Sequence, residues 1–222
     1  MTDLERHSMH VNGPRRKQSV TIGGVYGIGT NDVGWQVYWA QDNKTISVDP
    51  SYRTWHNIIS RCDKGGVYQQ KRPTYAGCSV DPRWHNYSVF VPWWVKNYVE
   101  GWQLDKDLLT LGNKVYGPDS AIFVPRWLNI FTVARGAGRG EYPIGLCFDK
   151  DKGKFKGQCN NPVTGAPIHL GYHQDPLISH RVWLWKKLEL AEELKPKMDE
   201  IDPRVYPNVV LIIKGCYDTN SI

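Results

Sequence analysis

The stretch from residue 104 to 129, LDKDLLTLGNKVYGPDSAIFVPRWLN, constrains the fold most strongly, because it orders its residues as a strand, a turn and a capped helix. Gly112 and Asn113 are typical of a turn. Pro118 and Asp119 suit the first turn of a helix. The apolar face of that helix would then consist of Ile122, Phe123, Trp127 and Leu128. This order predicts polar groups gathered where the strand meets the helix.

Two acidic residues begin this stretch, Asp105 and Asp107, with Lys106 between them. On a strand both carboxylates would point to the same face, because side chains alternate with period two. Two carboxylates on one face can hold a hard divalent cation such as Mg²⁺ or Mn²⁺, and Asn113 and Asn129 could add oxygen ligands. The candidate catalytic residues are therefore Asp105, Lys106, Asp107, Asn113 and Asn129, with Asp105 and Asp107 as metal ligands. The alternative is a solvated strand edge followed by an Asp-capped helix.

Upstream of this stretch the sequence predicts an arm and two helices. Residues 1–20 are polar and basic and predict a flexible arm. From Tyr52 to Cys62 the apolar residues recur at helical spacing, with one stripe formed by Trp55, Ile58, Ile59 and Cys62. A second helical pattern runs from Trp84 to Tyr98. We expect residues 21–133 to form one domain with mixed helices and strands.

A glycine-rich segment at residues 134–142 predicts a linker, and the pattern changes after it. Three short strands are expected at residues 144–148, 154–159 and 168–172. A helix should follow from Pro176 to Leu194, with its buried face formed by Ile178, Val182, Trp185 and Leu188. Residues 143–222 are thus expected to hold a small three-stranded antiparallel sheet packed on one helix, and the whole chain is predicted to be α+β.

Charge favours a polyanionic partner. The formal net charge is +6 and the isoelectric point is about 9.0, a balance suited to phosphate backbones. Basic residues cluster after residue 134, and lysines at period two would line one face of a strand pair that can enter a groove of double-stranded DNA. The candidate DNA-binding residues are Arg135, Arg139, Lys152, Lys154, Lys156 and Gln158. The alternative is a lysine-rich, exposed sheet face.

The cysteines and the apolar runs indicate in which cellular compartment the protein is expected. The five cysteines are odd in number and form no C-x-x-C motif, and no secretory leader is visible. No apolar run approaches the ~18 residues that a membrane span requires. These features favour a reduced, cytoplasmic protein without a membrane partner.

Two resemblances extend these expectations. The run EYPIGLCFDKDKGKFKGQCNNP, followed by HLGY and the helix from Pro176, resembles an Apetala-type DNA-binding domain. The segments YRTWHNIISRC, RPTYAGCSV and residues 104–129 resemble phage-encoded HNH-type homing endonucleases. The resemblance implies an irregular ββα-metal-like central region, double-stranded DNA as partner, one divalent cation as cofactor, and hydrolase activity in the cytoplasm of an infected bacterial host.

The sequence departs from the HNH pattern at two places. The family's histidine would lie near Lys106, and lysine is a poor substitute for an imidazole that accepts a proton near neutral pH. Relatives carry cysteines where this chain has Asp81 and Ala121, so a metal site shared with Cys62 and Cys78 would be incomplete. Two alternatives therefore stay open: a catalytically inactive factor that binds DNA or a host protein, and a structural or interaction protein of a phage assembly that uses its Trp-rich middle.

Overall fold

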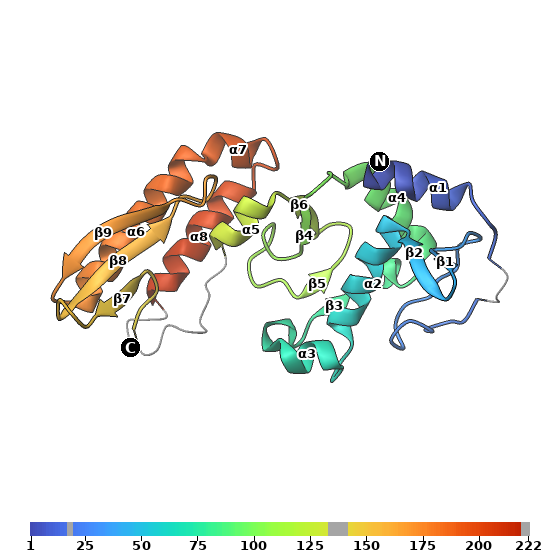
Figure 1. Cartoon of the computed structure of the whole chain (residues 1–222), viewed down its shortest axis with the longest axis horizontal. Helices are drawn as coiled ribbons and strands as arrows, with labels where there is room; N and C mark the ends of the chain where they lie inside the picture. The colour runs from blue at the N-terminus through green and yellow to red at the C-terminus, as the bar shows by residue number, and fades with distance from the viewer. Residues whose placement is uncertain (17–19, 133–141, 219–222) are drawn as a thin grey trace. The chain divides into compact units, whose positions relative to one another are not determined.

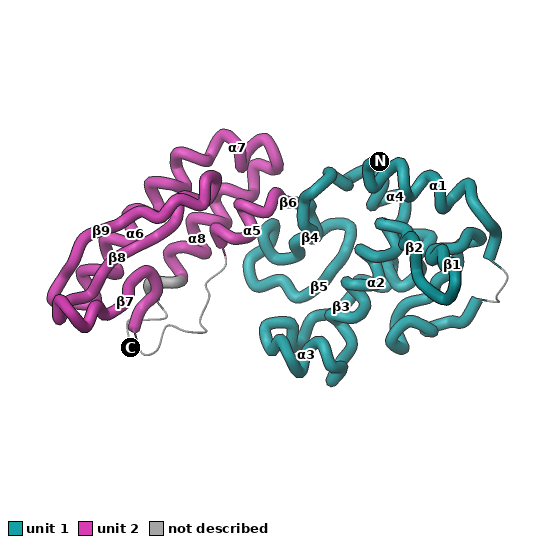
Figure 2. Tube along the Cα trace, viewed as in Figure 1, with its two compact units in different colours: residues 1–123 teal, residues 124–222 magenta. Residues whose placement is uncertain are grey.

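The computed structural model describes residues 1–16, 20–132 and 142–218, and side chains as far as residue 215. The chain forms two compact units, residues 1–123 and 124–222 (Figures 1 and 2). The sequence had suggested the boundary at residues 134–142, most of which lie outside the described residues. Helices and small sheets alternate in both units, so the fold class is α+β, as predicted.

The first unit contains short elements in an irregular order. They are α1 (Asp3–Val11), β1 (Tyr38–Gln41), β2 (Lys44–Val48), α2 (Pro50–Cys62), α3 (Val67–Lys71), η1 (Pro73–Tyr75), β3 (Ser79–Val80), η2 (Pro82–Trp84), α4 (Tyr87–Asn97), β4 (Gln103–Asp105), β5 (Val115–Tyr116) and β6 (Ile122–Val124), which crosses the boundary. Strands β1 and β2 form a hairpin, β3 pairs in parallel with β5, and β4 pairs with β6.

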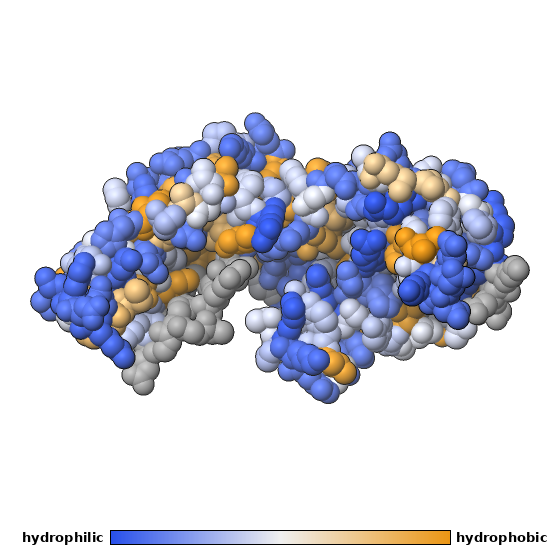
Figure 3. Space-filling view, in the orientation of Figure 1, coloured by the Kyte–Doolittle hydropathy of each residue, from blue (hydrophilic) through white to orange (hydrophobic). Residues whose placement is uncertain are grey.

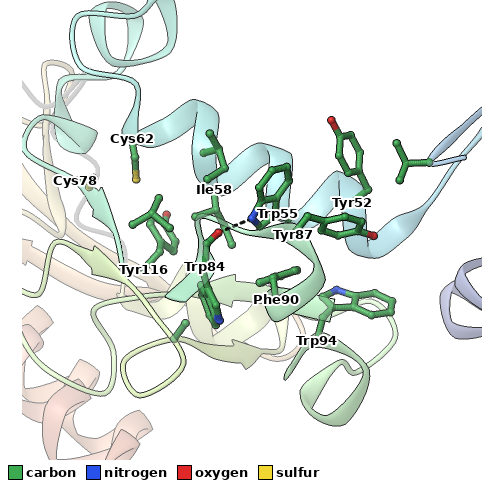
Figure 4. Packing of buried hydrophobic residues seen from close by; sticks show 14 of the residues in the cluster. Tyr52, Trp55, Ile58, Cys62, Cys78, Trp84, Tyr87, Phe90, Trp94 and Tyr116 are labelled. Carbon is green, nitrogen blue, oxygen red and sulfur yellow. Dashed lines mark hydrogen bonds between the residues drawn. The ribbon is translucent and has the colours of Figure 1, made fainter. Parts of the chain in front are cut away.

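The core of the first unit lies between α2 and α4. Helix α2 begins at Pro50. Asp49 caps it, because the Asp49 side chain accepts a hydrogen bond from the Ser51 amide. Its predicted apolar stripe is confirmed: Trp55, Ile58, Ile59 and Cys62 are all buried. The Trp55 indole donates to the carbonyl of Trp84 at 2.7 Å, which ties α2 to η2 (Figure 4). Trp84 and Trp94 are also buried, so these two tryptophans are core residues and form no exposed interaction surface.

The expectation of a flexible N-terminal arm is wrong for residues 3–11. Thr2 accepts a hydrogen bond from the amide of Glu5, and the Glu5 carboxylate accepts from the amide of Thr2, which is a capping box that starts α1. His7 and His10 on this helix are buried. The arm is helical because these histidines bond to residues 26 to 44 positions further along the chain, which local composition does not reveal.

The helix expected at Pro118 is also wrong. Residues 118–120 form a turn, and a strand, β6, follows before α5 (Arg126–Thr132) begins in the second unit. Ala121 donates its amide to the Gly117 carbonyl at 2.9 Å, but the hydrogen bonds do not continue into a helix. Pairing of β6 with β4 provides an alternative set of backbone partners for residues that have strong β propensity, Ile122 to Val124.

The second unit continues with β7 (Leu146–Asp149), β8 (Lys154–Asn160), β9 (Pro167–His173), α6 (Pro176–Glu193), α7 (Lys195–Asp199) and α8 (Val205–Asp218). The three strands form one antiparallel sheet in the order β7-β8-β9. This confirms the three predicted strands and the helix that follows them. The helix begins at Pro176, as predicted, and the Asp175 side chain caps it by accepting a hydrogen bond from the amide of Leu177.

The face of α6 that packs inward differs from the predicted one. Ile178 is 46% exposed and Trp185 is 67% exposed, whereas Trp183 and Leu190 are buried. Apolar residues surround α6 on all sides, so the sequence did not single out one face. The sheet and α8 both pack on this helix, and α8 contributes three buried residues at a spacing of four, Val205, Val209 and Ile213.

Among the described residues, no helix combines the length and the apolar character needed to cross a bilayer.

Candidate functional site

The outer face of the β7-β8-β9 sheet carries the basic residues that the sequence singled out. Gly157 lies against α6, because a Cβ placed on it would lie 3.7 Å from the Ser179 carbonyl oxygen. Cys159 is buried on the same side. Since strand side chains alternate, Lys154, Lys156 and Gln158 point to the opposite face, away from α6. The alternation on β8 is unbroken, because the extra residue at the bulge lies on β9.

The register brings further polar and aromatic groups to this outer face. Lys156 lies opposite Tyr172 on β9, and Gln158 lies opposite His169. The ring centroids of His169 and Tyr172 are 5.0 Å apart. The Lys152 ammonium lies 3.8 Å from the centroid of the Tyr172 ring, which is a cation–π contact. The outer face therefore combines cations, an aromatic ring and neutral hydrogen-bonding groups.

These lysines are not neutralised inside the protein. No ion pair to a carboxylate is made by Lys152, Lys154 or Lys156 in the described part of the chain. Asp149 lies opposite Lys154, but one oxygen of its carboxylate accepts the amides of Asp151 and Lys152 and closes the β7–β8 turn. The positive charge of the face is thus available to an external anion. The remaining two candidates for DNA binding, Arg135 and Arg139, lie outside the described residues.

The predicted acidic site has a different geometry from the one expected. Strand β4 ends at Asp105, so Asp105 and Asp107 do not share a strand face. The Asp105 carboxylate instead accepts the backbone amides of Asp107 and Leu108, at 2.9 and 2.8 Å, and shapes a tight turn. Burial and the neighbouring Asp107 carboxylate raise the pKa of Asp105 to about 6. The two carboxylates are therefore close enough to interact, although not as strand neighbours.

Lys106 is the cation of this turn. Its side chain is buried, and its ammonium donates to the Asp107 carboxylate at 3.0 Å and to the carbonyl of Asn113 at 3.3 Å. The Asn113 amide group returns a hydrogen bond to the Lys106 carbonyl at 2.6 Å. Lys106 and Asn113 therefore close the loop between β4 and β5, so both have a structural role. An ammonium bound to Asp107 also competes with any metal ion for that carboxylate.

The fifth residue expected in this site, Asn129, belongs to α5, in the second compact unit. Two histidines in the first unit have other partners. The His56 ring contacts the rings of Tyr26 and Tyr52. His85 Nε2 lies 3.3 Å from the carbonyl oxygen of Val80. Among the described residues, no group of three or more His, Cys, Asp or Glu side chains could hold a metal ion.

Asp81 and Ala121, which stand where the HNH-type pattern would have cysteines, provide no thiol. Asp81 accepts hydrogen bonds from Arg83, which also pairs with Asp119. Burial raises the pKa of the Cys62 thiol to about 12, with Cys78 as a second cause. A thiol must lose its proton to bind a metal, so a raised pKa weakens metal binding. Two carboxylates fit a Mg²⁺ ion that also binds water and phosphate, whereas two cysteines alone fall short of the four ligands of a structural zinc site.

Sequence reasoning missed a buried polar network in the first unit. The Asp49 carboxylate is fully buried and accepts hydrogen bonds from His7 at 2.8 Å, Trp35 at 3.0 Å and the Ser51 hydroxyl at 2.9 Å. Tyr87 donates to the same carboxylate at 3.2 Å. Burial acts to raise the pKa of Asp49, but these hydrogen bonds outweigh it and hold the pKa below its usual range.

The network holds a Ser, a His and an Asp, yet it does not form a nucleophilic triad. Nδ1 of His7 contacts both Asp49 and Ser51, whereas a triad places the hydroxyl and the carboxylate on opposite ring nitrogens. All three side chains are also buried. Their chemistry is therefore structural: they fix α1 to the start of α2. The sequence holds no local signal for this network, since its members are spread over residues 7 to 87.

No family model, curated protein or solved structure that was compared with the chain matches it.

Proposed function

We propose that the protein binds double-stranded DNA through the outer face of the β7-β8-β9 sheet. The observation that carries the proposal is the placement of Lys154, Lys156 and Gln158 on the sheet face that α6 leaves open. A two- or three-stranded ribbon fits the major groove, where lysines reach phosphates and amide groups reach base edges. The net charge of +6 supports the same partner.

Binding to a fluorescently labelled duplex at several salt concentrations tests this proposal. Replacing Lys154 and Lys156 by Ala leaves two phosphates without a cation, so the slope of log K against log salt should become shallower by about 1.8. Lys197→Ala with Lys214→Ala makes the same change in charge at exposed positions of α7 and α8 and should leave the slope unchanged. Equal binding by the two double variants would remove the sheet from the interface.

Gln158 provides a separate test of base recognition. If its amide group reads a base edge, Gln158→Ala should reduce discrimination between target and mismatched duplexes by about 1 to 3 kcal/mol. The salt slope should stay the same, because an amide group neutralises no phosphate. A uniform loss of affinity for all sequences would place Gln158 outside the groove.

A second candidate function is that of a divalent-metal-dependent DNA endonuclease of the HNH type. It is favoured by the raised pKa of Asp105 beside Asp107, because a carboxylate pair attracts a hard cation and a carboxyl with a pKa of about 6 can exchange a proton near neutral pH. Asp105 and Asp107 would hold the ion, and the ion would stabilise the charge that develops on the scissile phosphate.

Nicking of supercoiled plasmid with Mg²⁺ or Mn²⁺ tests the endonuclease proposal. Asp107→Asn should abolish nicking, whereas Asp42→Asn, at an exposed position of the β1–β2 turn, should not change it. Undiminished nicking by Asp107→Asn would remove Asp107 from the site. DNA binding by the wild-type protein without cleavage under either metal would leave the catalytically inactive DNA-binding factor as the function.

A further inference from the structure

We infer that the first unit carries a second DNA-binding surface, built around α3 and η1. We call it the α3 surface, and it consists of Arg61, Lys64, Tyr68, Lys71, Arg72, Tyr75 and Lys114. The inference rests on the proposed function, because duplex DNA is the ligand in both. It concerns different residues in a different compact unit, so the two can be tested separately.

Two stacked cation and tyrosine pairs form the centre of the α3 surface. The rings of Tyr68 and Tyr75 meet edge to face, with centroids 5.3 Å apart. The Arg72 guanidinium lies 5.3 Å from the centroid of Tyr68, and that of Arg61 lies 5.4 Å from the centroid of Tyr75. The ring of Tyr68 orients the exposed Arg72 guanidinium, which reduces the entropy lost when this group binds an anion, while the half-buried Arg61 supports the ring of Tyr75.

Hydrogen bonds hold the edges of this surface in place. Arg61 donates to the Tyr116 hydroxyl at 3.2 Å, which anchors it to β5. Lys114 donates to the Thr74 carbonyl at 3.1 Å and brings its positive charge to η1. Lys64, Lys71 and Arg72 are exposed around this centre. The cations therefore belong to one connected surface, although they come from residues more than fifty positions apart.

Positive charge exceeds negative charge on the α3 surface. Five cations gather there, and Asp63 is the single acidic residue between positions 61 and 75. None of the five forms an ion pair with a carboxylate within residues 1–16, 20–132 and 142–218. Hydrophilic residues cover most of the lobe that carries α3, at the lower edge of the first unit in Figure 3. Like charges repel one another, so binding a polyanion removes an internal cost as well as releasing counterions.

The anion that fits is the backbone of duplex DNA. Arginine binds a phosphate with two parallel hydrogen bonds, and lysine binds it as a point charge. A repeated backbone of phosphates can satisfy several such groups together, whereas a single small anion can satisfy one or two. An acidic protein is the competing partner, and competition by an acidic polypeptide separates it from DNA.

The test compares four forms of the full chain on one labelled duplex: wild type, Lys64→Ala/Lys71→Ala/Arg72→Ala, the sheet variant Lys154→Ala/Lys156→Ala, and a control. The control, Lys44→Ala/Lys96→Ala/Lys197→Ala, removes the same charge at exposed positions away from α3. The α3 variant should make the salt slope shallower by about 2.7, because each cation that binds a phosphate contributes about 0.9, and the control should not. Circular dichroism should show the same helix content in all four.

The outcomes separate the two proposals. An α3 variant that binds like the control, while the sheet variant loses affinity, overturns the α3 surface and leaves the sheet. The opposite result overturns the sheet and leaves the α3 surface. If poly-L-glutamate at equal charge concentration displaces the α3-dependent part of binding as well as unlabelled duplex does, the surface fits an acidic protein and the DNA assignment is overturned.

Discussion

The buried carboxylate of Asp49 allows a quantitative test of what holds the first unit together. Asp49→Asn keeps the shape of the side chain but removes its charge and replaces one acceptor oxygen by a donor NH₂ group. The new amide oxygen can still accept from Ser51, as Oδ1 of Asp49 does. The NH₂ group would then face the Trp35 indole N–H, which cannot act as an acceptor.

The cost follows from these contacts. Removing one member of a buried charged network costs about 3 to 5 kcal/mol, and an unpaired buried donor alone costs about 1 to 3 kcal/mol. We therefore expect Asp49→Asn to lower the free energy of unfolding of the first unit by about 3 to 5 kcal/mol. At a slope of about 2 kcal/mol per M of urea, in the middle of the range for small proteins, the unfolding midpoint falls by about 1.5 to 2.5 M.

Urea unfolding followed by tryptophan fluorescence measures this shift. Seven of the ten tryptophans, from Trp35 to Trp102, lie in the first unit and report mainly on it. Asp42→Asn is the matched control, because it makes the same chemical change at an exposed position and should cost less than about 0.5 kcal/mol. Ser51→Ala keeps the carboxylate and should cost about 1 to 2 kcal/mol. A loss below about 1 kcal/mol for Asp49→Asn would refute the view that this network anchors α1 and α2.

The remaining predictions concern two glycines, two thiols and one carboxyl. Gly145→Ala should destabilise the second unit by more than about 4 kcal/mol in thermal unfolding, because the φ of Gly145 is +91° and an added Cβ would lie 2.0 Å from a carbon of the Trp183 indole. Gly153→Ala should cost only about 1 to 2 kcal/mol, because Gly153 has φ +60° and an added Cβ would meet no atom within 4 Å. Similar losses of stability for the two variants would contradict the packing of Gly145 against Trp183. Alkylation mapped by mass spectrometry should modify the exposed Cys147 much faster than the buried Cys159, whose thiol pKa is raised by burial; equal rates would contradict this burial. The pKa of Asp105 is higher in the folded state than in the unfolded state, so the stability that Asp105 contributes should fall as pH rises from about 4 to about 6. Asp105→Asn should remove this part of the dependence of unfolding free energy on pH. An unchanged pH dependence in the variant would refute the rise in pKa from 3.8 to about 6.

Local patterns predicted the second unit better than the first. The alternation in β8 and the Asp-Pro start of α6 are local signals, and both elements begin where the sequence indicated. The prediction that Lys154 and Lys156 share one face of β8 came from the same pattern, because side chains on a strand alternate between the two faces of the sheet. Helix α2 was predicted for the same reason, because its apolar stripe lies within one segment, although the helix begins at Pro50, two residues before the predicted start at Tyr52.

The sequence by itself therefore determined the α+β class, the three-stranded sheet with its helix, and the residues that share the outer face of β8. Tertiary structure decided which side of α6 is buried, because the apolar residues of this helix do not gather on one face and the sheet and α8 select the side that packs. It also decided that His7 is part of a core, because its partners Asp49 and Ser51 lie more than forty positions further along the chain. In each of these cases the deciding contact joins segments that are distant in sequence or that have no distinguishing local pattern, so only packing and hydrogen bonding in the folded chain could settle it.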